Sequence, residues 1–272
     1  MQPLGSGTVG YTGSLTRELL SAVAIAQRDV WKFLRDRVRI ISTFIFPVAF
    51  VLILGQSFDT GGGFGYDYRT FVFVGVLGQT MFQSAALGIV SLIEDRENDF
   101  SQAIFVAPIS RYTIVSGKIA GEAIVALVQG LFIIGFGLAI GVPITLQQAI
   151  ALLPASILVC LFGGAFGLLL MANIGSQRAA NQLFPFVFLP QFFLAGVFNP
   201  ISKLGPLLSI LSALTPMRYA VDILRGIYYW GSPDAELVVL QPPLVNLAVL
   251  VVAGVAFMVA GTYMFVRSER NK

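Results

Sequence analysis

Six long hydrophobic stretches, separated by more polar segments, dominate the pattern of this chain. They cover roughly residues 40–58, 70–93, 119–141, 148–173, 182–198 and 244–266. A helix needs about 20 mostly apolar residues to cross the hydrocarbon layer of a membrane, and there it satisfies its own backbone hydrogen bonds. The pattern therefore predicts an all-α integral membrane protein with six transmembrane helices within residues 40–272.

The composition supports this class and excludes others. Of the 272 residues, 56% are hydrophobic and 11% are charged, and the mean hydropathy is +0.83. Soluble domains carry about 25% charged residues. The chain has no His and a single Cys, Cys160, so it offers no His/Cys set for zinc, haem or an iron–sulfur cluster. We expect neither a metal site nor a cofactor in it.

The positions of Lys and Arg predict the orientation. Cytoplasmic loops of membrane proteins carry an excess of these residues, which also explains the net charge of +3 without a nucleic-acid partner. Of the 17 Lys and Arg residues, thirteen fall on one side of the spans and four on the other. We expect a multi-pass protein of the cell membrane with both termini in the cytoplasm. The thirteen are Arg17, Arg28, Lys32, Arg35, Arg37, Arg39, Arg96, Arg111, Lys118, Arg178, Arg267, Arg270 and Lys272; the four are Arg69, Lys203, Arg218 and Arg225.

The segment before the first span is amphipathic. Between residues 14 and 39, apolar side chains recur at spacings of three, four and seven, and charged residues occupy much of the remainder. This favours an amphipathic helix lying in the cytoplasmic interface of the membrane. A soluble helix packed on a partner protein is the alternative. Residues 1–13 are polar and Gly-rich and lack the apolar region of a signal peptide, so we expect a disordered tail.

Ionisable side chains are nearly absent from the predicted spans. Glu122 lies about one turn inside the third span, and no other acid or base falls within one. An ion-coupled transporter usually needs buried carboxylates or bases to take up and release its coupling ion. A membrane enzyme would need a nucleophile or an acid–base cluster near the interface. The sequence therefore argues against both, and the energy for transport would come from elsewhere.

The segment 94–118, between the second and third spans, combines charge with an apolar patch. Its first six residues include four acids, and an apolar run, 103–106, follows before Pro108. A short charged helix with an apolar face at the membrane surface is suited to dock in a groove of another protein. A solvated loop between helices is the alternative. The acids are Glu94, Asp95, Glu97 and Asp99.

Residues 199–240, between the fifth and sixth spans, are too long and too apolar for a free outer loop. Prolines at 200, 206 and 216 divide them into short pieces with apolar helical faces. This favours re-entrant helices that dip into the outer leaflet. Asp222 lies four residues from Arg218 and three from Arg225, so one acid can bridge two bases on a helix face. We expect these three residues to form a structural clamp rather than to contact a substrate.

Two motifs resemble those of ABC-2 type permeases, the membrane halves of ATP-binding-cassette exporters. The first runs from Asp95-Arg96-Glu97 through Ala107-Pro108-Ile109-Ser110-Arg111 to Gly117-Lys118. In it, Asn98-Asp99 occupies the family's usual Gly region and Ala107 replaces its Thr. The second comprises residues 192–202 and 214–226, with Pro216, Tyr219, Asp222 and Arg225 at the family's positions. The resemblance covers essentially the whole chain and includes drug- and antibiotic-resistance exporters.

The resemblance implies a transporter subunit that is not itself an enzyme. The chain lacks the phosphate loop G-x-x-x-x-G-K-[ST], because position 112 is Tyr and Ile119 follows Gly117-Lys118. ATP and Mg²⁺ would therefore bind a separate ABC ATPase subunit docked on residues 94–106. A second permease copy, identical or different, would complete the transporter in the membrane lipid. The docking residues implied are Glu94, Asp95, Arg96, Glu97, Asp99, Phe100, Phe105 and Arg111.

Spans two and five would line the translocation path, by resemblance and by residue content. Their aromatic and neutral amide side chains suit a hydrophobic or amphiphilic cargo, such as a drug, a lipid or a lipid-linked molecule. Ordinary helix packing is the alternative for the same side chains. The other functional hypotheses are an ion- or gradient-driven transporter or channel, and a permease that senses its ligand or confers immunity without export. The candidate path residues are Gln79, Phe82, Gln83, Phe188, Gln191 and Phe192.

Overall fold

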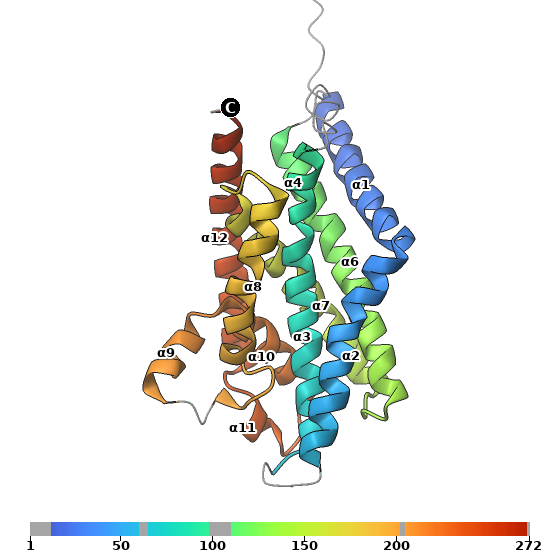
Figure 1. Cartoon of the computed structure of the whole chain (residues 1–272), viewed down its shortest axis with the longest axis vertical. Coiled ribbons are helices and arrows are strands. Elements are labelled where there is room, and N and C mark those ends of the chain that lie inside the picture. The colour runs from blue at the N-terminus through green and yellow to red at the C-terminus, as the bar shows by residue number, and fades with distance from the viewer. Residues whose placement is uncertain (1–11, 60–64, 98–109, 202–204, 271–272) are drawn as a thin grey trace, which may run out of the picture.

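The protein is a bundle of long helices. A computed structural model describes residues 12–59, 65–97, 110–201 and 205–270, and within these ranges it contains helices and connections but no strand. Figure 1 shows α1 and α4 near one end of the bundle, the α1 end, and α9, α10 and α11 near the other, the α10 end. The helices are α1 Thr12–Arg35, α2 Arg37–Asp59, α3 Tyr68–Gly88, α4 Val90–Glu97, α6 Arg111–Ala139, α7 Leu146–Met171, α8 Gln177–Leu194, α9 Pro206–Ala213, α10 Pro216–Tyr228, α11 Ala235–Val238 and α12 Pro243–Arg270.

Five helical stretches in the described residues are long and apolar enough to cross a membrane, and the bent pair α9–α10 would make a sixth. The five correspond to the predicted spans 40–58, 70–93, 119–141, 148–173 and 244–266. The predicted span 182–198 forms α8, which falls outside this set and has a polar first half with Gln177, Arg178, Asn181 and Gln182. Nevertheless, α8 contacts α4 at the α1 end and α10 at the α10 end. The all-helical membrane fold is confirmed.

Helix α3 forms the centre of the bundle, between α2 and α8 in Figure 1. Most of its residues are buried, because α2, α6, α7 and α10 all pack against it. Helix α7 approaches through glycines: a Cβ at Gly163 would lie 2.3 Å from the Phe82 carbonyl oxygen, and one at Gly167 would lie 2.4 Å from that of Ala86. Small residues allow such backbone approach in membrane bundles. The central helix is therefore locked between its neighbours.

The amphipathic N-terminal segment forms α1, which packs along the first turns of α6. A Cβ at Gly117 would lie 2.8 Å from the Ala22 carbonyl oxygen, and one at Gly121 would lie 2.9 Å from the Ala26 Cα. Towards α6 the helix buries Ala26, Asp29 and Phe33. Its other side exposes Leu19, Leu20, Val23 and Trp31. The helix predicted over 14–39 is shorter at its end: α1 stops at Arg35, and residues 37–39 begin α2 after a break at Asp36. Its position in a membrane interface stays a prediction, and the tail 1–13 lies almost wholly outside the described residues.

Residues 199–240, the predicted re-entrant segment, divide at their prolines. Pro206 and Pro216 each occupy the first helical position, of α9 and α10, where the missing N–H costs no hydrogen bond. The two helices meet at an angle of 86°, the geometry of a broken span or a re-entrant loop. Helix α10 is buried against α3, α7 and α12, whereas α9 exposes Leu207 and Ile210, and Leu214 directly after it is exposed as well.

Candidate functional site

A set of four charges, of which Asp29 and Lys118 are buried and Arg28 and Asp95 are partly buried, joins three helices at the α1 end. We call Arg28 and Asp29 of α1, Asp95 of α4 and Lys118 of α6 the charge cluster. The Lys118 Nζ lies 2.8 Å from Asp95 Oδ2 and 3.0 Å from Asp29 Oδ2. Arg28 donates hydrogen bonds to both Asp29 and Asp95. Two cations thus balance two anions, which is the condition under which buried charges are tolerated.

The local sequence explains why these side chains meet. Asp29 lies on the buried face of α1, between Ala26 and Phe33, at the three- and four-residue spacings of a helix face. Lys118 follows Gly117, whose backbone touches Ala22, so the close approach of α1 and α6 places the amine beside Asp29. Burial opposes the charge of Arg28, but its hydrogen bonds and its attraction to Asp95 and Asp29 outweigh burial and raise its pKa.

Two further contacts tie α1 to both ends of the segment 98–109. Before the segment, Lys32 Nζ lies 3.0 Å from Glu94 Oε2 of α4. After it, the Glu18 carboxylate accepts hydrogen bonds from the Ser110 backbone N–H at 3.0 Å and from the Thr113 hydroxyl. A carboxylate at the start of a helix is favourable because the first N–H groups have no partner within the helix and the positive end of the helix dipole lies there. Helix α1 therefore spans the gap between α4 and α6.

The predicted docking residues occupy different environments. Glu94 and Asp95 face the chain's own α1 and α6. Arg96 and Glu97 end α4, and Arg111 begins α6, but the structure does not describe their side chains. Three further predicted docking residues lie wholly outside the described residues: Asp99, Phe100 and Phe105. Sequence reasoning missed the partners Glu18, Asp29 and Lys118. The signal for Asp29 was an acid in register with the apolar face of an amphipathic helix.

The predicted clamp residues bind separate segments. In the described residues no ion pair joins Asp222 to Arg218 or Arg225. Asp222 accepts from the Leu240 N–H at 2.8 Å, the Gln241 N–H at 2.9 Å and the Asn246 amide at 2.7 Å. Arg225, fully buried, donates to the carbonyls of Phe71 (3.3 Å) and Val197 (3.2 Å) and stacks on the Phe71 ring. Arg218 donates to the Ser212 hydroxyl at 3.2 Å. Backbone groups, the Asn246 amide and the Ser212 hydroxyl thus take the place of the intrahelical bridges that the spacing predicted.

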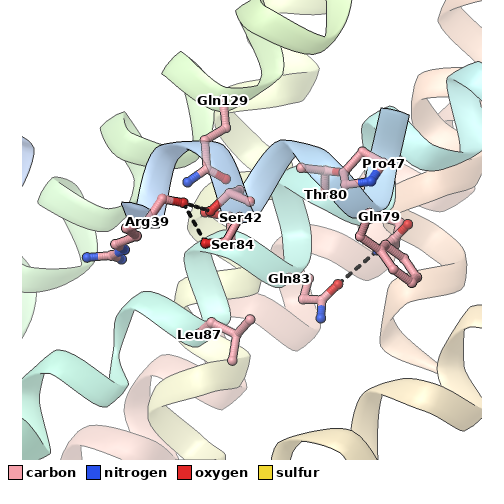
Figure 2. Close-up of a pocket in the computed structure, with 11 residues that line it drawn as sticks. Arg39, Ser42, Pro47, Gln79, Thr80, Gln83, Ser84, Leu87 and Gln129 are labelled. Carbon is pink, nitrogen blue, oxygen red and sulfur yellow. Dashed lines mark hydrogen bonds between the residues drawn. The ribbon is translucent and has the colours of Figure 1, made fainter. Parts of the chain in front are cut away.

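The six predicted path residues fall into three groups. Gln79 and Gln83 line a pocket of about 240 Å³ between α2, α3 and α6, drawn in Figure 2. Phe82 and Phe188 pack in an aromatic group with Phe162 and Phe166. The Gln191 amide oxygen accepts from the Met217 N–H at 3.3 Å, and Phe192 contacts Phe46 of α2. Of the six, Gln79 and Gln83 lie together at this pocket.

The comparisons with known proteins agree with this helical membrane architecture. A family model described as ABC-2 type transporter matches residues 21–229. The protein ycf38, named as a transport permease, is 23% identical over 204 residues in Cyanophora paradoxa, covering 73% of this chain and 70% of that protein. Its counterpart in Porphyra purpurea is 24% identical over 224 residues, covering 80% and 76%. YbhR of Escherichia coli K12, named as a multidrug ABC transporter permease, is 28% identical over 167 residues, covering 60% and 44%.

The matched segment includes most of α1, the charge cluster and α10. The chain belongs to the ABC-2 type transporter family. It is a multi-pass permease subunit of an ABC transporter, non-catalytic and without a cofactor of its own, and its family implies an ATPase partner.

Proposed function

We propose that this chain is the permease of an ATP-driven exporter that moves a hydrophobic or amphiphilic molecule outward. A separate ABC ATPase would dock on residues 94–106 at the α1 end, which would face the cytoplasm. A second permease copy would complete the transporter. The observation that carries the proposal is the connection of α1 to both ends of the segment 98–109.

This connection supports a route for mechanical coupling. A push on the segment 98–109 would reach α4 before it and α6 after it, and α1 is bonded to both through Lys32, Glu18 and the charge cluster. Helix α1 leads into α2 across a break at Asp36, whose carboxylate accepts from the Arg39 N–H at 2.9 Å. Helices α2 and α6 both line the pocket beside α3. Movement at the ATPase would thereby change the relative positions of the helices around that pocket.

Co-purification with the ATPase tests the proposal. The tagged chain is purified from native membranes in mild detergent, and we expect a soluble ATPase in roughly equal amount. Reversing charge on the docking segment with Glu97→Lys should remove the ATPase and abolish export while the chain remains inserted. The matched control is Glu236→Lys, the same change on exposed α11 at the opposite end. A wild-type preparation free of ATPase even after crosslinking, or full export by the Glu97→Lys variant, would refute the proposal.

A further inference from the structure

The pocket between α2, α3 and α6 is lined mostly by polar residues although it lies among membrane spans. Its polar walls come from Ser42 and Thr43 of α2, from Gln79, Gln83 and Ser84 of α3, and from Gln129 of α6. Gln79 and Gln129 lie in the middle third of the spans Tyr68–Asp95 and Tyr112–Ala139. Polar groups are costly there because hydrocarbon offers no hydrogen-bond partners. Figure 2 shows the Gln129 amide pointing toward Ser42 and Ser84.

Hydrogen bonds inside the protein occupy some polar groups of this pocket and leave others without a partner. The hydroxyls of Ser42 and Thr43 both donate to the Arg39 carbonyl, and the Gln79 amide donates to Gln83 Oε1 at 2.8 Å. Three buried oxygens have no protein partner: Gln79 Oε1, Thr80 Oγ1 and Gln129 Oε1. These side chains are 1%, 5% and 2% exposed. Since buried polar atoms normally have partners, these two amide oxygens and this hydroxyl mark positions where the donors of a ligand would be stabilised.

Charge and size narrow the ligand class. Arg39 borders the pocket, and its guanidinium lies 3.6 Å from the buried Glu122 carboxylate, so the two charges balance. Such a pocket selects by donors rather than by net negative charge. A drug-sized ligand needs a pocket of about 300–1,000 Å³, whereas this one holds about 240 Å³. The lining also includes the apolar side chains of Phe46 and Leu87, both exposed at the protein surface, which suit an acyl chain left outside.

We propose that this pocket binds the headgroup of a membrane lipid that carries primary amine or hydroxyl donors. The donors would meet the free oxygens of Gln79, Thr80 and Gln129, the phosphate would lie toward Arg39, and the tails would pass Phe46 and Leu87. A headgroup held in the middle of the membrane is partway across it. That this lipid is the exporter's cargo rests on the proposed function, whereas its binding in the pocket does not.

Native mass spectrometry of the purified full chain tests the binding. The chain is titrated with three dioleoyl lipids: phosphatidylethanolamine has amine donors, phosphatidylglycerol has hydroxyl donors, and phosphatidylcholine has the phosphate but no donor. We expect at least one donor lipid to bind about tenfold more tightly than phosphatidylcholine, the effect of two or so hydrogen bonds. Which donor lipid binds distinguishes amine from hydroxyl. Equal affinity for all three lipids would overturn the proposal, because it would show that the pocket does not recognise the headgroup donors.

A double variant localises the effect. Thr80→Val with Gln129→Leu removes two acceptors while keeping side chains of similar size, and burying fewer polar groups should not prevent folding. The preference for donor lipids should fall to within about twofold, while Gln182→Leu, the same change on the exposed side of α8, should keep it. A preference that survives in the double variant would place the lipid elsewhere and overturn the assignment. A chain that binds donor lipids but exports none would overturn the lipid as the exporter's cargo and leave the binding site intact.

Discussion

Lys118 of α6 and Asp29 of α1 form a buried ion pair, with Nζ and Oδ2 3.0 Å apart and both side chains at most 2% exposed. The two residues lie 89 positions apart in sequence. The pair fixes the amphipathic helix to the third predicted span at the end where the family resemblance places the ATPase. It therefore connects the energy source to the membrane bundle in the proposed mechanism.

Replacing Lys118 with Met should destabilise the protein strongly. The change leaves the buried Asp29 and the partly buried Asp95 with Arg28 as their remaining cation, and breaking a buried pair from one side costs about 3–5 kcal/mol. Thermal unfolding in detergent measures the loss. Lys32→Met, at the more exposed pair with Glu94, should cost about 1 kcal/mol or less. Adding Asp29→Asn to the Lys118→Met variant should restore part of the stability; no difference between the two lysine variants would show that burial does not matter here.

Gly117→Val should detach α1 from α6. The new Cβ would lie 2.8 Å from the Ala22 carbonyl oxygen, and overpacking of this kind costs about 1–3 kcal/mol. Trypsin cleavage at the exposed Arg17 of α1 should become faster. Gly135→Val is the matched control on the same helix, because a Cβ there meets nothing within 4 Å. Equal cleavage rates in the two variants would contradict the close packing.

Arg225→Met should loosen the α10 end. It removes the donor to the Phe71 and Val197 carbonyls, and hydrogen bonds to a charged group contribute about 1.5–3 kcal/mol each. We expect a loss of about 2 kcal/mol or more in thermal unfolding. Arg218→Met removes one bond of a half-buried arginine to Ser212 and should cost about 1 kcal/mol. The reverse order of the two losses would refute the structural role given to Arg225.

Cysteine labelling in intact cells checks the proposed orientation. The single native cysteine, Cys160, is buried and should stay unlabelled by a membrane-impermeant maleimide. An added cysteine at Glu236, exposed at the α10 end, should react from outside. One at Asn173, exposed between α7 and α8, should react only after the membrane is opened. Labelling of the Asn173→Cys variant in intact cells would show that the chain has the opposite orientation in the membrane.

The sequence was most informative where a periodic pattern extends over many residues. Hydropathy located five of the spans, since about twenty apolar residues in a row have few other uses, and the proline positions marked the starts of α9 and α10. It was less informative for α8, where polar residues at 177, 178, 181 and 182 dilute the pattern. Spacing along one helix also suggested the wrong partners for Asp222, because backbone N–H groups of residues 240 and 241 compete for its oxygens.

By itself, the sequence determined the membrane class, the helices, the unequal distribution of Lys and Arg and the family motifs, all of which follow from local composition and order. Tertiary structure alone decided that Glu94 and Asp95 face their own chain, and that Gln79 opens on a pocket while Phe82 packs in a core. Residues a few positions apart on one helix point in different directions. What each of them contacts depends on helices that are distant in sequence. The buried oxygens of Gln79 and Gln129 belong to one site because α3 and α6 pack side by side.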